Sequence, residues 1–360
     1  MNRNIPSKIA IDDKWITVHL AGPGFGEAVL ITIGQKIAIG IDCCFSLIEA
    51  NQKGEPTYLE TQIASLGNPS YMFWLISHFH ADHIQSFDRV LDLFEDKLDN
   101  IIVPPDYTER DLIANEIYVD AKQTMKKSIL AEVAKTQYEG IRDAISRESL
   151  ENKVESTGTK HTWLKSILQL PDGKTEVELQ VDLYGLTHRE SRALQGKAVK
   201  GIKQNRKTAS LANEGSYILH IRAGAFEGLF LGDGHIRRTA KILNQIKPND
   251  ASIIYLKVAH HGSTTGTSQL LLDKITETTT KIAERYALIA PFDLNGLPVS
   301  RIERMITNAG FQIRKSGSGP HSESLSGRIS RQCDPIVPAR VDRASVAASD
   351  IIVERIELRP

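Results

Sequence analysis

The chain has 360 residues, 41% hydrophobic and 24% charged, so it has enough apolar material to bury a sizeable core, and disorder is not expected. Lys plus Arg and Asp plus Glu both total 44, so no overall charge attracts nucleic acid or an anionic membrane, and only a local patch can do so. No apolar run reaches the roughly 20 residues of a membrane span, no signal-peptide pattern opens the chain, and the three cysteines resemble no disulfide framework, so we expect a cytoplasmic protein.

Short β-type runs separated by glycines open the chain. They predict strands over 15–20, 28–33 and 36–42. The compact apolar run 73–77 predicts another strand, and an amphipathic helix is expected to begin near Ser86. The polar stretch 78–83 lies between these two elements, so we expect its side chains at the carboxyl end of a strand.

The rest of the chain first turns helical and then alternates strands with helices. After a short strand over 101–105, apolar residues at helical spacing predict a helical insertion at about 105–150. Strands are then expected over 162–170, 176–186, 216–223 and 228–234, within 251–263, over 286–292 and over 350–358, with helices over 239–246 and 268–282. This order predicts an α/β fold with two sheets sandwiched between helices. We assign 1–320 to one domain and 321–360 to a C-terminal extension that packs on it.

Four potential metal ligands lie within six residues of one another: His78, His80, Asp82 and His83. Imidazole suits zinc or iron, and a carboxylate can hold or orient a bound water. A cluster of this density directly after a buried strand is better explained by a metal site than by chance. Because four ligands on one sharp loop can face two neighbouring ions, the stretch predicts a metal centre.

Two later motifs also follow predicted strands. Asp233 lies in the motif LGDG at 231–234, and the pair His260 and His261 lies in the motif KVAHHGS at 257–263. These side chains are therefore also expected at strand ends, where they can join the same site. His235 lies two residues after Asp233 and is a further candidate catalytic residue.

The pattern H-x-H-x-D-H at 78–83, followed by G-D at 232–233 and K-V-x-H-H-G-S at 257–263, resembles the metallo-β-lactamase superfamily. Within it, the text is most similar to the branch that includes the hydrolase-like domain of the DNA-uptake protein ComEC. Residues 23–42 also resemble that branch's V-G-Q-G-D-A and L-L-I-D-x-G elements. The resemblance implies an αββα metallo-β-lactamase sandwich with a binuclear metal site between the sheets.

The resemblance also implies how the ligands are shared. His78 and His80 hold one ion, the second ion is held by Asp82, His83 and His260, and Asp233 bridges the two. His188 matches a third histidine that many members supply to the first ion, although the ComEC-like branch often lacks it. Between His260 and His261 we favour His260 as the ligand. The other histidine then donates a hydrogen bond behind the ligands or a proton to the leaving group.

Two neighbouring ions lower the pKa of a shared water, so that a metal-bridging hydroxide attacks the substrate, and Asp82 is expected to orient it as a catalytic residue. The ions also polarise the electrophilic oxygen of the substrate. Imidazole and carboxylate ligands without a thiolate favour two Zn²⁺ ions, with Mn²⁺ or Fe as alternatives.

The segment 189–207 is strongly basic, and Glu190 is its one acid. Its basic residues are Arg189, Arg192, Lys197, Lys200, Lys203, Arg206 and Lys207. Because the segment follows His188, we expect it at the rim of the site, where all of these except Lys197 are assigned to bind substrate phosphates. The competing interpretation is an exposed loop with solvated charges. Together with the ComEC-like resemblance, the segment favours a phosphodiesterase or nuclease acting on nucleic acid or on linear or cyclic nucleotides.

Two other classes of function stay open. A small-molecule hydrolase acting on a thioester, lactone or β-lactam would use the same metals but needs a narrow apolar pocket. A non-catalytic scaffold would keep the fold to bind a protein partner or a second copy of the chain, and the intact ligand set argues against it. A redox di-iron enzyme is conceivable within the superfamily, but nothing in the sequence resembles a flavin-binding partner domain.

Overall fold

The structure is a computed structural model that describes residues 5–21, 27–43, 58–67, 69–78, 81–84, 87–104, 153–155, 160–187, 189–194, 197, 213–246, 251, 253–277, 284–292, 296–316 and 351–359. The helical insertion predicted at about 105–150 lies outside these residues. The same is true of 198–207 in the basic segment and of 321–350 in the predicted C-terminal extension.

The described strands form two sheets. Sheet A has eight strands in the order β1 (Lys8–Ala10), β8 (Lys160–Gln169), β9 (Glu176–Tyr184), β10 (Ile218–Ala223), β11 (Phe226–Phe230), β12 (Ile253–Lys257), β13 (Glu284–Ile289) and β14 (Gln312–Lys315). Sheet B has seven strands in the order β15 (Ile351–Glu357), β2 (Trp15–Ala21), β3 (Ala28–Ile33), β4 (Ile37–Ile41), β5 (Tyr71–Leu75), β6 (Asn100–Ile102) and β7 (Val154–Glu155).

The two sheets pack face to face on a core of aliphatic and aromatic side chains, and the central strands β3 and β4 of sheet B are buried on both faces. Along β3, Val29 and Ile31 belong to the core between the sheets, whereas Leu30 belongs to the core under the helices. Successive side chains of a strand point to opposite faces, so a strand buried on both sides reads as a continuous apolar run. This explains why the text AVLITI shows no polar alternation.

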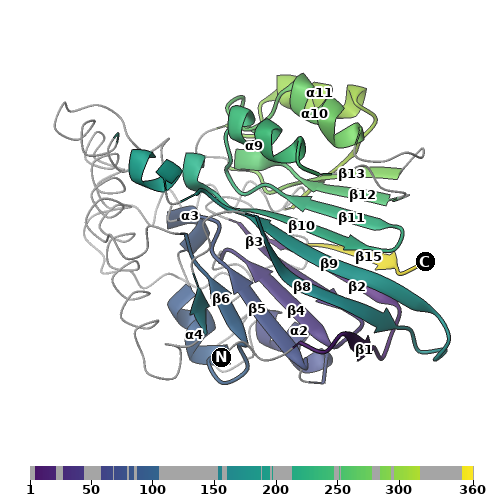
Figure 1. Cartoon of the computed structure of the whole chain (residues 1–360). Helices are drawn as coiled ribbons and strands as arrows, with labels where there is room; N and C mark the ends of the chain where they lie inside the picture. Colours follow the sequence, from purple (N-terminus) through teal and green to yellow (C-terminus); the bar gives the residue numbers. More distant parts are fainter. Residues whose placement is uncertain are drawn as a thin grey trace.

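Helices cover the outer face of each sheet (Figure 1). On sheet B these are α2 (Tyr58–Ser65), α3 (Ala81–Ile84) and α4 (Phe87–Phe94), and on sheet A they are α9 (Ile236–Leu243), α10 (Gln269–Thr276) and α11 (Ser300–Asn308). The layers are therefore α, β, β and α, which confirms the predicted sandwich. Within the described residues, no helix is long and apolar enough to cross a membrane.

The strand predicted over 73–77 is β5, which begins and ends two residues earlier. The sheet ladder stops because the backbone N–H of Ser77 donates to Oδ1 of Asp42 at 2.6 Å instead of to a neighbouring strand. The chain then runs on to His78 outside the sheet. At the other end of the sequence, β15 pairs antiparallel with β2, so the last strand is an edge of sheet B.

Candidate metal centre

The candidate residues come from both sheets, at the carboxyl ends of parallel strands. His78 and His83 follow β5, which is parallel to β4, and His83 lies on the short helix α3. Asp233 follows β11, and His260 follows β12, the parallel neighbour of β11. Loops beyond the carboxyl ends of parallel strands are where open α/β sheets bind ligands, and here both sheets contribute to one such place.

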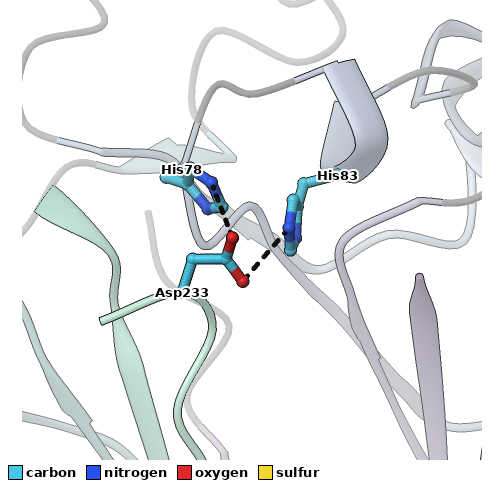
Figure 2. A group of neighbouring side chains, drawn as sticks. All are labelled: His78, His83 and Asp233. Carbon is cyan, nitrogen blue, oxygen red and sulfur yellow. Dashed lines mark ion pairs between the residues drawn. The ribbon is translucent and has the colours of Figure 1, made fainter. Parts of the chain in front are cut away.

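Three buried side chains converge at this place: His78, His83 and Asp233 (Figure 2). Nε2 of His78 lies 3.8 Å from Oδ2 of Asp233, and Nε2 of His83 lies 3.4 Å from Oδ1 of the same carboxylate. The two imidazole rings are 4.2 Å apart between centroids. Each residue thus offers one ligand atom within the reach of a single metal ion.

Hydrogen bonds on the far side of the rings fix which nitrogen of each histidine faces Asp233. The Ser77 hydroxyl donates its only proton to Oδ2 of Asp42 at 2.7 Å, so it accepts from Nδ1–H of His78, 3.0 Å away. Nδ1 of His83 lies 2.7 Å from the same Asp42 oxygen and therefore also carries a proton. Nε2 is therefore the nitrogen that faces the carboxylate in both rings, and it is the atom that each ring would offer to a metal ion.

Asp233 is held in a buried and positively polarised environment. Burial would raise its pKa, but positive charge on His83 and its contact with the carboxylate, followed by charge on His260 and His261, lower that pKa well below its usual range, and a metal cation at the same place would act in the same direction. Within the described residues, Oδ1 of Asp233 is buried without a hydrogen bond of ordinary geometry. A buried carboxylate oxygen in this position needs a partner, and a metal ion between the two Nε2 atoms would supply one.

The pair His260 and His261 sits in a strained turn, with φ of 51° and 53°. Such left-handed conformations of residues other than glycine persist only where the surroundings impose them, often at functional sites. Nε2 of His260 lies 3.7 Å from Oδ2 of Asp233, and its side chain is 26% exposed. His261 is buried, donates from Nδ1 to the carbonyl of Ala290 at 2.9 Å and stacks on Phe292. His260 is therefore the member of the pair that faces Asp233.

His235 directly precedes α9 and is partly exposed. Its Nδ1 lies 3.7 Å from Oε1 of Glu214. The interaction with His235, followed by the charges of Lys197 and Arg238, lowers the pKa of Glu214 although burial opposes the shift. In the part of the chain that the structure describes, His235 thus pairs with Glu214.

Several predicted site residues lie outside the described residues: His80, His188, Lys200, Lys203, Arg206 and Lys207. The backbone of Asp82 belongs to α3, but its side chain is not described. The structure therefore brings together His78, His83, Asp233 and His260 from the predicted ligand set.

The start of the basic segment forms a helical turn over 189–194 that carries Arg189 and Arg192 on its exposed surface. Glu190 anchors it: its carboxylate accepts from the backbone N–H of Thr187 at 3.0 Å and from Lys241 of α9 at 3.0 Å. The Thr187 hydroxyl accepts in return from the N–H of Glu190 at 3.1 Å, which completes a capping box. These bonds, led by that of Thr187 and opposed by burial, lower the pKa of Glu190 to about 2.

Sequence reasoning missed two residues that support the ligands. Asp42 is buried behind His83 as described above, and Nδ2 of Asn213 lies 3.4 Å from Nε2 of His260. A signal existed for Asp42, because it follows β4 as a strand-end carboxylate in the text that resembles L-L-I-D-x-G. Asn213 has no such signal, since it belongs to none of the motifs.

No protein-family model and no curated protein sequence matches the chain. Among solved structures it is similar to a mutant of the β-hydroxylase CmlA, with 11% sequence identity, a TM-score of 0.39 and coverage of 83% of this chain and 52% of that one. It is also similar to Tm1679, a metal-dependent hydrolase of the β-lactamase superfamily, with 11% identity, a TM-score of 0.37 and coverage of 84% and 97%. This chain thus spans about half the length of the hydroxylase. The two names denote different reactions, so a function has to be argued from the residues of this chain.

Proposed function

We propose that this protein is a metal-dependent hydrolase whose active site is the cluster around Asp233. One observation carries the proposal: the Nε2 atoms of His78 and His83 point at a buried carboxylate, and hydrogen bonds behind both rings occupy Nδ1, so Nε2 is the atom that each ring offers to a metal ion. This donor set fits a transition-metal ion. His260 is the partly exposed member of the set, with 26% of its side chain accessible.

The residues that the sequence adds to this set are His80, Asp82 and, from the resemblance, His188. With them the site would hold up to two ions, with Zn²⁺ as the expected metal and Mn²⁺ or Fe as alternatives. When bound, such ions lower the pKa of a water molecule and polarise the oxygen of the bond to be cleaved. In this proposal the chain itself orients the imidazoles and excludes bulk water around Asp233.

We infer that the substrate is a phosphodiester, in nucleic acid or in a nucleotide. The positive charge of Lys197 helps to lower the pKa of Glu214. Asn213, the residue before Glu214, lies 3.4 Å from His260. The helical turn 189–194 is joined to α9, the helix that follows Asp233, through Glu190 and Lys241. These contacts connect the described beginning of the basic segment to residues next to His260 and to the helix after Asp233, which supports the proposal that the segment attracts phosphate groups at the rim.

The test is an assay panel with metal-stripped and metal-reloaded protein. The panel contains bis-p-nitrophenyl phosphate, single-stranded and double-stranded nucleic acids, cyclic nucleotides and a thioester. We expect cleavage of phosphodiesters only after reloading with Zn²⁺ or Mn²⁺. Cleavage of the thioester alone would replace the phosphodiesterase by the small-molecule hydrolase, and a metal-loaded protein inactive on the whole panel would favour the scaffold.

A further inference from the structure

A second buried cluster lies directly behind the candidate ligands, and it is centred on Glu27. Glu27 immediately precedes β3 and is 2% exposed. Its Oε1 lies 3.7 Å from Nδ1 of His83, and its Oε2 lies 3.4 Å from Nδ1 of His261. Each carboxylate oxygen of Glu27 thus faces the Nδ1 atom of a different histidine. In His83 this is the edge of the ring opposite to the Nε2 atom that faces Asp233.

The charge of Glu27 is balanced by Lys257, the last residue of β12. Nζ of Lys257 contacts Oε1 of Glu27 and lies 3.4 Å from the carbonyl of Gly232, and the lysine is 1% exposed. Glu27 lies directly before β3 of sheet B and Lys257 ends β12 of sheet A, so the ion pair links the two sheets beneath the candidate centre. A buried charge is tolerated only when it is paired in this way.

Glu27, Asp42 and His83 also have the spacing of a metal site of their own. Two contacts argue against a second ion there. The ammonium group of Lys257 already stands against Glu27, and Nδ1 of His83 carries the proton that it shares with Asp42, so it has no lone pair to offer. The cluster is therefore built to support ligands and not to bind a metal itself.

We propose that Glu27 is a positioning residue for the metal centre, and that Lys257 is the counter-ion that keeps its carboxylate in place. The Nδ1–H groups of His83 and His261 donate to Asp42 and to the Ala290 carbonyl, and the negative charge of Glu27 beside both nitrogens adds an attraction that holds Nδ1 as the protonated atom and leaves Nε2 for the metal. His261 is thereby fixed in the turn whose other histidine, His260, faces Asp233. This inference rests on the proposed metal site, and it adds a pair of residues that link the ligand turns of the two sheets.

The test measures Zn²⁺ binding to metal-free protein by competition with a chelating dye, together with the visible absorption spectrum of the Co²⁺-loaded protein. Glu27→Gln is expected to weaken Zn²⁺ binding about 10- to 100-fold, the usual effect of removing a partner behind metal ligands, and to alter the Co²⁺ spectrum. Because Glu27→Gln leaves Lys257 buried without its counter-ion, the double variant Glu27→Gln/Lys257→Met is measured as well. It removes both charges and is expected to restore thermal stability but not Zn²⁺ affinity.

The matched control is Glu227→Gln, which breaks a buried pair outside this cluster, where Oε1 of Glu227 lies 2.8 Å from Nε2 of His220. Zn²⁺ affinity should be unchanged in this variant. Wild-type affinity and an unaltered Co²⁺ spectrum in the double variant would overturn the positioning role, and so would failure of the double variant to fold, because the pair would then serve the fold. If the wild-type protein itself binds no Zn²⁺, the proposed function fails first and this inference fails with it.

Discussion

Nδ1 of His83 lies 2.7 Å from Oδ2 of Asp42, and this contact joins the end of β4 to the helix that carries the histidine. Asp42 has a left-handed backbone with φ of 57°, a conformation that asparagine also tolerates. Asp42→Asn therefore removes the charge without new backbone strain. We expect Zn²⁺ affinity to fall about 10- to 100-fold, because the ring of His83 loses the acceptor that fixes its tautomer.

The matched control for this variant is Asp182→Asn, which changes another buried carboxylate, one that accepts hydrogen bonds from Thr162 and Gln180 in sheet A. Competition with a chelating dye measures both variants. Equal Zn²⁺ affinity in Asp42→Asn and Asp182→Asn would show that Asp42 supports the fold but not the metal.

Asp233→Asn should reduce turnover to background while the protein stays folded. The amide keeps the shape of the side chain but loses the negative charge that faces the Nε2 atoms of His78 and His83. Removing one buried carboxylate also relieves its desolvation, so we expect little loss of stability in the metal-free protein. The rate with bis-p-nitrophenyl phosphate and the unfolding temperature should both be measured. Near wild-type turnover with full metal content would mean that Asp233 is not the central carboxylate.

Gly262 closes the histidine turn with φ of 82°, and a Cβ there would come within 2.5 Å of Cβ of Pro298. Gly262→Ala combines the left-handed penalty of about 1–2 kcal/mol with overpacking of about 1–3 kcal/mol. We expect it to lower both the free energy of unfolding and the Zn²⁺ affinity, because His260 and His261 precede it.

Gly173→Ala provides the control, since Gly173 has φ of 67° with no atom within 4 Å of the added Cβ. Gly173→Ala should lower the free energy of unfolding only by the left-handed backbone penalty, and its Zn²⁺ affinity should stay unchanged. Urea unfolding and dye competition compare the two variants. If Gly262→Ala behaved like Gly173→Ala in both measurements, the turn would not be constrained by Pro298.

The fold was predictable where a local signal marks an element. The strands β2, β3 and β4 are apolar runs bounded by glycines, and α10 begins one residue after Ser268, whose hydroxyl accepts from the N–H of Leu271. The start of α9 was misplaced by three residues because His235 provides no side-chain cap. The helix α11 was missed for a related reason: Val299 offers no cap, and only Ile302 and Ile306 are buried along it.

The residues of the candidate site were likewise predictable only where a local sequence signal marks them. Ligands that are neighbours in sequence, as in 78–83, are visible in the text, and a strand-end position made Asp233 visible too. Asp42 carries a strand-end signal of its own, but the contacts that support the ligands do not show in the sequence, because each joins distant segments: Asp42 is 41 residues from His83, and Glu27 is 230 residues from Lys257. Such contacts form only when the chain folds, so no spacing in the sequence predicts them.

Replacing Lys200, Lys203, Arg206 and Lys207 together by glutamine should weaken the binding of a polyanionic substrate but not that of a small one. Counterion release makes the affinity for several phosphates fall steeply with salt, so the variant should show a raised KM and a flatter salt dependence for single-stranded DNA. Hydrolysis of bis-p-nitrophenyl phosphate should barely change, which distinguishes lost contacts from misfolding. An unchanged salt slope would remove this segment from the substrate site.

The central claim is that His78, His83 and Asp233 hold a metal ion, and the number of Zn²⁺ ions bound per chain tests it most directly. Metal-free protein is exposed to Zn²⁺, desalted and measured by plasma mass spectrometry, with circular dichroism to confirm the fold. We predict up to two ions per chain in the wild-type protein and fewer in His83→Ala. The circular dichroism spectrum of His83→Ala should equal that of the wild-type protein. A wild-type protein that stays metal-free after exposure to both Zn²⁺ and Mn²⁺ would contradict the claim.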